Sequence, residues 1–136
     1  MMKRSKSMFH VLVVTALFFF PTISSAEETY RLRMFFGLSI PTGGAVSLKQ
    51  WNDFEKSLLA TSFDGFNVVD LVGYYQGSPE RSKLVTLIVK GKDINKIDDV
   101  QEAKKVAKAY ARKLGQESVM IVTVPILAWD FIEAEK

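Results

Sequence analysis

Two stretches of β-forming residues, 66–76 and 81–90, follow each other in the chain with only Gly77-Ser78-Pro79-Glu80 between them. Glycine and proline in so short a connection predict a turn, and therefore an antiparallel hairpin. Both stretches carry apolar residues at odd and at even positions. Successive side chains of a strand point to opposite faces, so this hairpin has two apolar faces. A single layer of helices covers only one of them, and something else must cover the other.

The hairpin lies at the centre of a β-α-β-β-α-β order. A strand over 30–39 precedes a helix that begins at Ser47, where Gln50 completes a capping box. A second helix covers about 96–114, and a last strand covers 118–124. Two right-handed crossovers around antiparallel central strands predict an α+β fold of the ferredoxin-like split βαβ type. Four antiparallel strands would form one sheet, with both helices on one face.

Three occupants suit the second face of the sheet. A second copy of the chain could pack against it, sheet to sheet, and form a homodimer. The C-terminal tail with Leu127, Trp129 and Phe131 could fold back over it. A ligand trapped against the face is the third alternative.

The N-terminal segment 1–26 has the order of a cleavable export signal. Basic residues (Lys3, Arg4, Lys6) come first, an apolar run over 8–20 follows, and Ala26 ends a stretch of small residues. Thirteen helical residues extend about 20 Å, less than the roughly 30 Å of a bilayer core, although an uncleaved anchor is the alternative. We expect a single mature domain over 27–136, in the periplasm or secreted, which meets the membrane only during export.

Removing this segment changes the charge and the available chemistry. The chain has 18 basic and 15 acidic residues, and three of the basic ones lie in the signal, so the mature domain is neutral. A neutral domain gives no reason to expect nucleic acid as a partner. The only histidine is His10, and there is no cysteine. The mature domain therefore lacks the residues for Ser-His-Asp or Cys-His catalysis, the usual zinc sites and disulfides, and we expect no metal and no cofactor.

Two polar segments are the candidates for chemistry. Glu80-Arg81-Ser82 opens the third strand, and Gln116-Glu117-Ser118 opens the fourth. Glu80 and Glu117 could act as a paired acid and base, with Arg81 holding an anionic group and Gln116 and Ser118 binding beside it. The structural alternative, which we favour, is an ion pair from Arg81 to Glu117 or Glu80 that clamps the end of the sheet.

The aromatic residues with polar groups have two interpretations as well. Tyr75 could be a general acid, and Trp51 could line a ligand pocket. We favour core positions for Tyr74, Tyr75 and Tyr110, with hydroxyls that reach the surface. Gly43-Gly44 is a plain turn because no lysine or longer glycine pattern follows it.

A resemblance extends over about 32–124. It rests on the following segments: Phe36-Gly37-Leu38-Ser39, Gly43-Gly44, Val46-Ser47, Trp51, Phe54, Phe63-Asp64-Gly65-Phe66, Gly73, Glu80-Arg81-Ser82-Lys83 and Gly115-Gln116-Glu117-Ser118-Val119. In these the chain resembles the domain-of-unknown-function family three-five-seven-four, small exported bacterial proteins. It departs at Ala60-Thr61-Ser62, where a Pro-Arg pair is expected, and at Tyr75, where Trp is usual. The resemblance implies no particular activity.

Two hypotheses about function follow. The first is a noncatalytic exported domain that self-associates through its sheet face and binds a small molecule or another envelope protein. The alternative is a cofactor-independent enzyme of the dimeric α+β barrel type that acts on a small organic substrate, and it rests on fold analogy alone.

Overall fold

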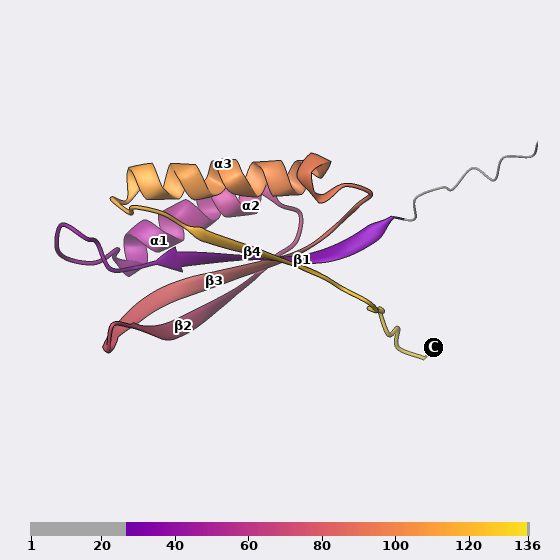
Figure 1. The fold of residues 1–136 in the computed structure, drawn as a ribbon, viewed down its shortest axis with the longest axis horizontal. Helices are drawn as coiled ribbons and strands as arrows, with labels where there is room; N and C mark the ends of the chain where they lie inside the picture. Colours follow the sequence, from indigo (N-terminus) through magenta and orange to yellow (C-terminus); the bar gives the residue numbers. More distant parts are fainter. Residues whose placement is uncertain (1–26, 136) are drawn as a thin grey trace, which may run out of the picture.

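The computed structural model describes residues 27–135 and places four antiparallel strands in one sheet (Figure 1). In chain order the elements are β1 (Glu28–Gly37), α1 (Leu48–Phe54), a π-helical turn η1 (Glu55–Leu59), α2 (Ala60–Ser62), β2 (Asn67–Tyr75), β3 (Ser78–Gly91), a 3₁₀ turn η2 (Ile94–Lys96), α3 (Asp98–Lys113) and β4 (Met120–Pro125). The strand order is β2-β3-β1-β4. This is the predicted ferredoxin-like α+β sandwich, and the expectation is confirmed.

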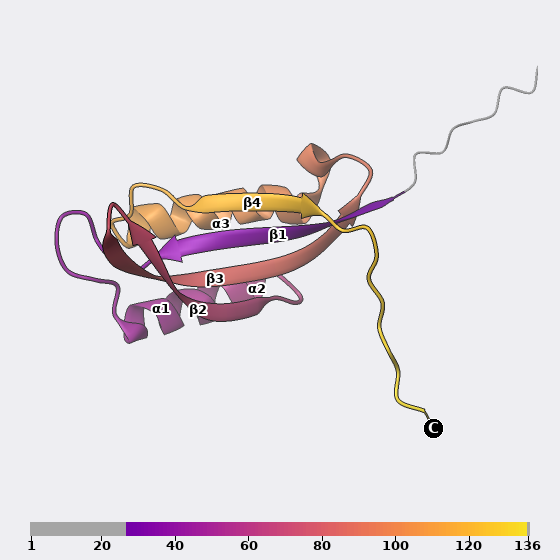
Figure 2. The same cartoon turned by 60° about the horizontal axis from the view of Figure 1, so that its bottom comes forward.

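All the α-helices lie on one side of the sheet, and the other side has no layer over it (Figure 2). We call the uncovered side the open face. Leu32, Met34 and Phe36 of β1 point toward the helices and are buried. The alternating residues Arg31, Arg33 and Phe35 point to the open face, as the period of a strand requires.

The first helix begins as its sequence predicts and then changes its geometry. The Ser47 hydroxyl accepts from the Gln50 backbone N–H, and the Gln50 side chain accepts from the Ser47 backbone N–H. The π-helical turn that follows inserts one extra residue into the ladder of hydrogen bonds. At this turn Leu59 points into the core and is fully buried, while its neighbour Leu58 is only partly buried.

The second long helix, α3, follows its predicted pattern closely. Its apolar positions recur at intervals of three and four, and all of them are buried: Ile97, Val100, Ala103, Val106, Ala107, Tyr110 and Leu114. Gly115 has φ +67°, and the Gln116 N–H donates to the Ala111 carbonyl, which is a Schellman ending. The basic run of α3, from Lys104 to Lys113, is exposed, as expected of a solvated face.

The turn of the central hairpin lies two residues earlier than predicted. Tyr75 pairs with Ser78, so Gln76 and Gly77 alone form the loop, with φ of 48° and 79°. Positive φ at both positions is the signature of a type I′ turn, whose twist matches that of the strands. Pro79 therefore belongs to β3, opposite Tyr74. It is tolerated there because β1 ends at Gly37, opposite Ser82, and no strand needs the missing N–H.

Four aromatic rings form the centre of the core. Phe36 lies 4.8 Å from Tyr110 and 5.5 Å from Phe54, and Trp51 lies 5.6 Å from Phe36, between ring centroids. The Tyr110 hydroxyl donates to the Gly37 carbonyl over 2.6 Å. Its hydroxyl is thus satisfied internally, and burial raises the pKa of Tyr110 to about 12.

The predicted export signal lies outside the described residues. Within 27–135, no helix has both the length and the apolar character needed to cross a membrane.

Candidate functional site

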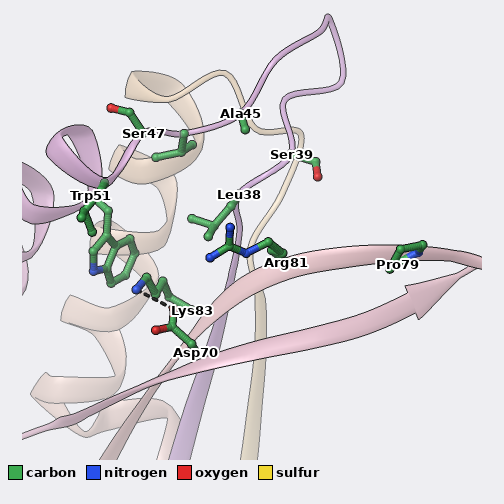
Figure 3. Close-up of a pocket in the computed structure, with 11 residues that line it drawn as sticks. Leu38, Ser39, Ala45, Ser47, Trp51, Asp70, Pro79, Arg81 and Lys83 are labelled. Carbon is green, nitrogen blue, oxygen red and sulfur yellow. Dashed lines mark ion pairs between the residues drawn. The ribbon is translucent and has the colours of Figure 1, made fainter.

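The end of the sheet nearest the hairpin turn contains a cleft of about 560 Å³ (Figure 3). One wall is the β2–β3 hairpin, which continues past the end of β1. The opposite wall is the chain that leaves β1 and returns to begin α1. Eleven residues line the cleft: Leu38, Ser39, Ala45, Val46, Ser47, Leu48, Trp51, Asp70, Pro79, Arg81 and Lys83.

Backbone hydrogen bonds fix the two walls relative to each other. The Leu38 N–H donates to the Arg81 carbonyl over 3.0 Å, and the Val46 N–H donates to the Leu38 carbonyl over 2.7 Å. Ser39 and Ala45 form a β-bridge that closes the loop between them. This loop includes Gly43 and Gly44, both with positive φ, so the predicted turn is present in the structure.

The floor of the cleft is apolar and bears one ion pair. Leu38, Val46 and Trp51 are buried beneath it. The Lys83 ammonium lies 2.6 Å from the Asp70 carboxylate and 5.7 Å from the centroid of the Trp51 ring. Its hydrogen bond to the carboxylate and its charge keep the pKa of Asp70 below the usual value. Asp70 is therefore ionised and paired at neutral pH.

Arg81 and Trp51, two of the residues predicted to bind a ligand, meet in this cleft. Figure 3 shows the Arg81 side chain extending from β3 toward the side of α1. Within residues 27–135 no ion pair includes Arg81. The favoured clamp from Arg81 to Glu117 or Glu80 is accordingly not formed in the structure.

The two predicted catalytic carboxylates do not join this cleft. Glu80 and Arg81 are successive residues of β3, so their side chains point to opposite faces, and Glu80 points to the open face. Glu117 is exposed in the connection before β4. In the described part of the chain neither carboxylate forms an ion pair.

Gln116 and Ser118 also lie outside the cleft. The Gln116 amide donates to the Ser39 carbonyl over 2.9 Å and so fastens the chain before β4 to the loop after β1. A methyl group at Gly37 would lie 3.2 Å from the Gln116 oxygen, so the two positions are packed together. Ser118 is exposed. Gln116 therefore has a structural contact, and the lining of the cleft does not include it.

The prediction that the tyrosines belong to the core is wrong for two of the three. Tyr74 and Tyr75 are 76% and 63% exposed, because they lie beside the turn, where the hairpin extends past the end of β1. Tyr110 is fully buried, as expected, but its hydroxyl meets a carbonyl instead of the surface. Tyr75 borders the turn, and its side chain points to the open face.

Sequence reasoning missed Asp70, Lys83 and Leu48 as members of the site. Asp70 and Lys83 are directly paired across the hairpin, a contact that opposite charges on neighbouring strands can reveal when the register is known. Leu48 is 68% exposed at the rim of the cleft, in the first turn of a helix whose other apolar residues are buried. In the sequence, Leu48 could have been recognised as an apolar residue that lies outside the buried stripe of its helix.

The open face contains a second candidate surface on the other side of the sheet. One row of directly paired residues, Val69, Leu84, Phe35 and Met120, is apolar across all four strands. Val69 and Met120 are about half exposed, at 51% and 57%. Arg33 lies beside this row, with its guanidinium 5.2 Å from the Phe35 ring centroid. The predicted apolar character of both hairpin faces is thus present in the structure.

The C-terminal tail leaves the open face largely uncovered. It runs away from the sheet in Figure 2. Trp129 touches the edge of the face, where its indole N–H donates to the Thr29 hydroxyl and the Lys90 ammonium lies 4.1 Å from its ring centroid. Leu127 and Phe131 are exposed, so the alternative in which the tail folds back over the face is not seen for these two residues.

No cluster of three or more His, Cys, Asp or Glu residues that could hold a metal ion occurs in the part of the chain that the structure describes. The site is instead built from one arginine, one ion pair, two serines and apolar side chains. Within the described residues such a set offers one unpaired positive charge, hydroxyl groups and apolar contact.

Comparison with known proteins first supports the fold class. A phage SAM lyase solved in complex with S-methyl-5′-thioadenosine is 17% identical, with 72% of this chain and 81% of that chain covered and a TM-score of 0.53. The same kind of lyase without ligand is 16% identical, with coverages of 71% and 79% and a TM-score of 0.47. The support for the fold comes from the first structure, and at 17% identity that likeness concerns the fold alone.

The family follows from a direct match. Residues 31–129 match the model of the family described as "Protein of unknown function (DUF3574)", and the chain belongs to this family. The resemblance inferred from the sequence is thereby confirmed. A search of curated proteins finds no match.

Proposed function

We propose that this protein is a noncatalytic exported domain that self-associates through its open face. The observation that carries the proposal is the apolar row Val69, Leu84, Phe35 and Met120, which crosses the whole sheet without a helix over it. Within this row Val69 and Met120 are about half exposed, Phe35 is partly exposed, and Leu84 is buried. Partly exposed apolar side chains that lie together on one face of a sheet are typical of an interaction site. Two sheets packed face to face about 10 Å apart would remove it from water.

A second copy suits this face because the chain itself carries the complementary charges. Arg31 and Arg33 lie on the open face in the two rows beyond Phe35. Asp130, Glu133 and Glu135 lie in the exposed tail, which begins at the edge of the same face. In a homodimer the acidic tail of one copy reaches the arginines of the other, so association brings opposite charges together. Another envelope protein is the competing partner.

Two substitutions in β2 test the face with a matched control. Val69 on the open face and Val72 on the opposite face are similarly exposed, at 51% and 62%. Val69→Glu places a carboxylate in the proposed interface, and we expect the dimer to weaken by more than tenfold because an unpaired buried charge costs several kcal/mol. Val72→Glu should leave the dimer unchanged. Light scattering after size exclusion measures both, and a parent protein that stays monomeric at high concentration contradicts the proposal.

Export is a separate part of this proposal. It rests on the basic, apolar and small-residue order of 1–26. A cell that makes the whole chain should release, into its periplasm or medium, a protein whose mass corresponds to a start at Glu27. A full-length product that sediments with membranes would favour the uncleaved anchor.

The enzyme alternative has less support in the geometry. Glu80 and Glu117 are exposed and lie outside the cleft. If a reaction on a small organic substrate is found, Glu80→Gln and Glu117→Gln should abolish turnover while thermal unfolding stays unchanged. Retained turnover in both variants would exclude these carboxylates as acid and base.

A further inference from the structure

The cleft at the end of the sheet has an unbalanced positive charge. Of its three charged residues, Lys83 and Asp70 neutralise each other over 2.6 Å. Arg81 takes part in no ion pair within residues 27–135. Its guanidinium has donors for a planar anion in a bidentate arrangement. The cleft therefore offers one charge-assisted site for one negative group.

The remaining lining favours an apolar body next to that anion. Leu38, Val46 and Trp51 form a rigid buried floor, and Pro79 belongs to the hairpin wall. The exposed Leu48 lies at the rim, where an apolar ligand would shield it from water. The Ser47 hydroxyl accepts from Gln50, and its own hydrogen remains available as a donor.

From this arrangement we propose that the cleft binds a small organic carboxylate with an apolar or aromatic body. The carboxylate pairs with Arg81, and the body lies over Trp51 and Leu38 against Leu48. A volume of about 560 Å³ falls within the usual range for a small-molecule site, about 300–1,000 Å³. A single unpaired cation matches a monoanion better than a phosphate dianion. The cleft is on the helix side of the sheet, so this inference does not depend on association through the open face.

The fluorescence of Trp51 provides a direct measurement. The chain has two tryptophans, and Trp129→Phe leaves Trp51 as the only indole. Titration with phenylacetate should change this fluorescence, and the neutral phenylacetamide should bind about tenfold more weakly, since a charge-assisted hydrogen bond has about that effect. Equal binding of the two compounds, or no binding of either at millimolar concentration, overturns the proposal.

Two substitutions change the charge of the cleft in opposite directions. Arg81→Gln should reduce phenylacetate affinity about tenfold and remove the preference over the amide. Asp70→Asn frees Lys83 from its partner and should increase phenylacetate affinity severalfold. A gain of affinity cannot result from a folding defect, so this variant keeps the test valid if Arg81→Gln is unstable.

The control removes the same unit of charge elsewhere. Lys104 is exposed on α3 and does not line the cleft, so Lys104→Gln should leave the affinity unchanged. An equal loss in Lys104→Gln and Arg81→Gln would show attraction by net charge alone and would refute the assigned site. An Asp70→Asn variant that binds phenylacetate with the affinity of the parent protein would also refute the assigned site.

Discussion

At the scale of single residues, Tyr110 joins the core to the end of β1. Its hydroxyl donates to the carbonyl of Gly37, the last residue of that strand, and its ring packs against Phe36 and Phe54. Tyr110→Phe should lower the free energy of unfolding by about 1–2 kcal/mol at neutral pH, because a partly buried carbonyl loses its donor. Urea denaturation measures this change, and an unaltered stability at pH 7 would contradict it.

The same residue gives a pH dependence with a defined sign. The ordinary pKa of a tyrosine is 10.0, and burial raises the pKa of Tyr110 to about 12 in the folded protein. Between these values the unfolded chain loses a proton that the folded protein keeps, so stability falls as pH rises. In Tyr110→Phe this contribution is absent. The stability difference between parent and variant should therefore narrow from pH 9 to about pH 12, and a constant difference would exclude this role.

Gly91 is required for a close contact between strand and helix. A methyl group there would lie 2.6 Å from Cγ1 of Ile97, the residue that precedes α3. Gly91→Ala should destabilise the fold by about 1–3 kcal/mol through overpacking. Gly65→Ala is the control, since nothing lies within 4 Å of the added methyl group. Ile97→Ala added to Gly91→Ala should show favourable coupling in a double-mutant cycle of unfolding free energies, and strict additivity would contradict the clash.

At the scale of elements, the hairpin turn determines the register on which the cleft depends. Gly77 has φ +79° and Gln76 has φ 48°, values that side chains rarely adopt, although Asn does so more readily than Gln. Gly77→Ala should destabilise the protein by about 1 kcal/mol, whereas Gln76→Asn should stabilise it slightly. Thermal unfolding of the two variants gives the comparison, and equal effects of the same sign would argue against a type I′ turn.

This hairpin also shows which parts of the structure can be predicted from the sequence. The order of elements and the capping box of Ser47 and Gln50 are local signals, and both were predicted correctly. A turn at Gly77–Glu80 would have placed Asp70 opposite Leu87, whereas the observed turn places it opposite Lys83. Because an ion pair across strands depends on register, an error of two residues was enough to hide the charged part of the cleft.

The cleft itself depends on where several elements end. β1 stops at Gly37 while the hairpin continues to Gln76, and this difference in length opens the space beside Arg81.

The π-helical turn after α1 is a second feature that the local sequence pattern does not predict. It begins at Glu55, whose carboxylate accepts from the Trp51 indole over 2.5 Å, and within it Leu59 is fully buried whereas Leu58 is only partly buried. Residue periodicity assumes a uniform helix and cannot report such an insertion.

At the scale of the whole molecule, the sheet separates two surfaces of different chemistry. The helix side has the cleft with Arg81, and the open face has the apolar row with Arg31 and Arg33 beside it. The tail with Asp130, Glu133 and Glu135 leaves from the edge of the open face. If these acids neutralise the arginines of a second copy, the charge contribution to association is attractive. Without the tail, its three acids no longer face Arg31 and Arg33, and repulsion between the arginines of the two copies is less compensated.

Salt should therefore affect the association of the full chain and of a chain that ends at Ile126 in opposite directions. Screening becomes strong above about 0.1 M salt, where the Debye length is about 10 Å. The dimer of the full chain should weaken as salt rises, because attraction between tail and arginines is screened. The shortened chain should form a weaker dimer at low salt that strengthens as salt rises, because repulsion between Arg31 and Arg33 of the two copies is screened. Sedimentation equilibrium measures both constants. The same sign of salt dependence in the two chains would show that the tail does not reach the open face of the partner.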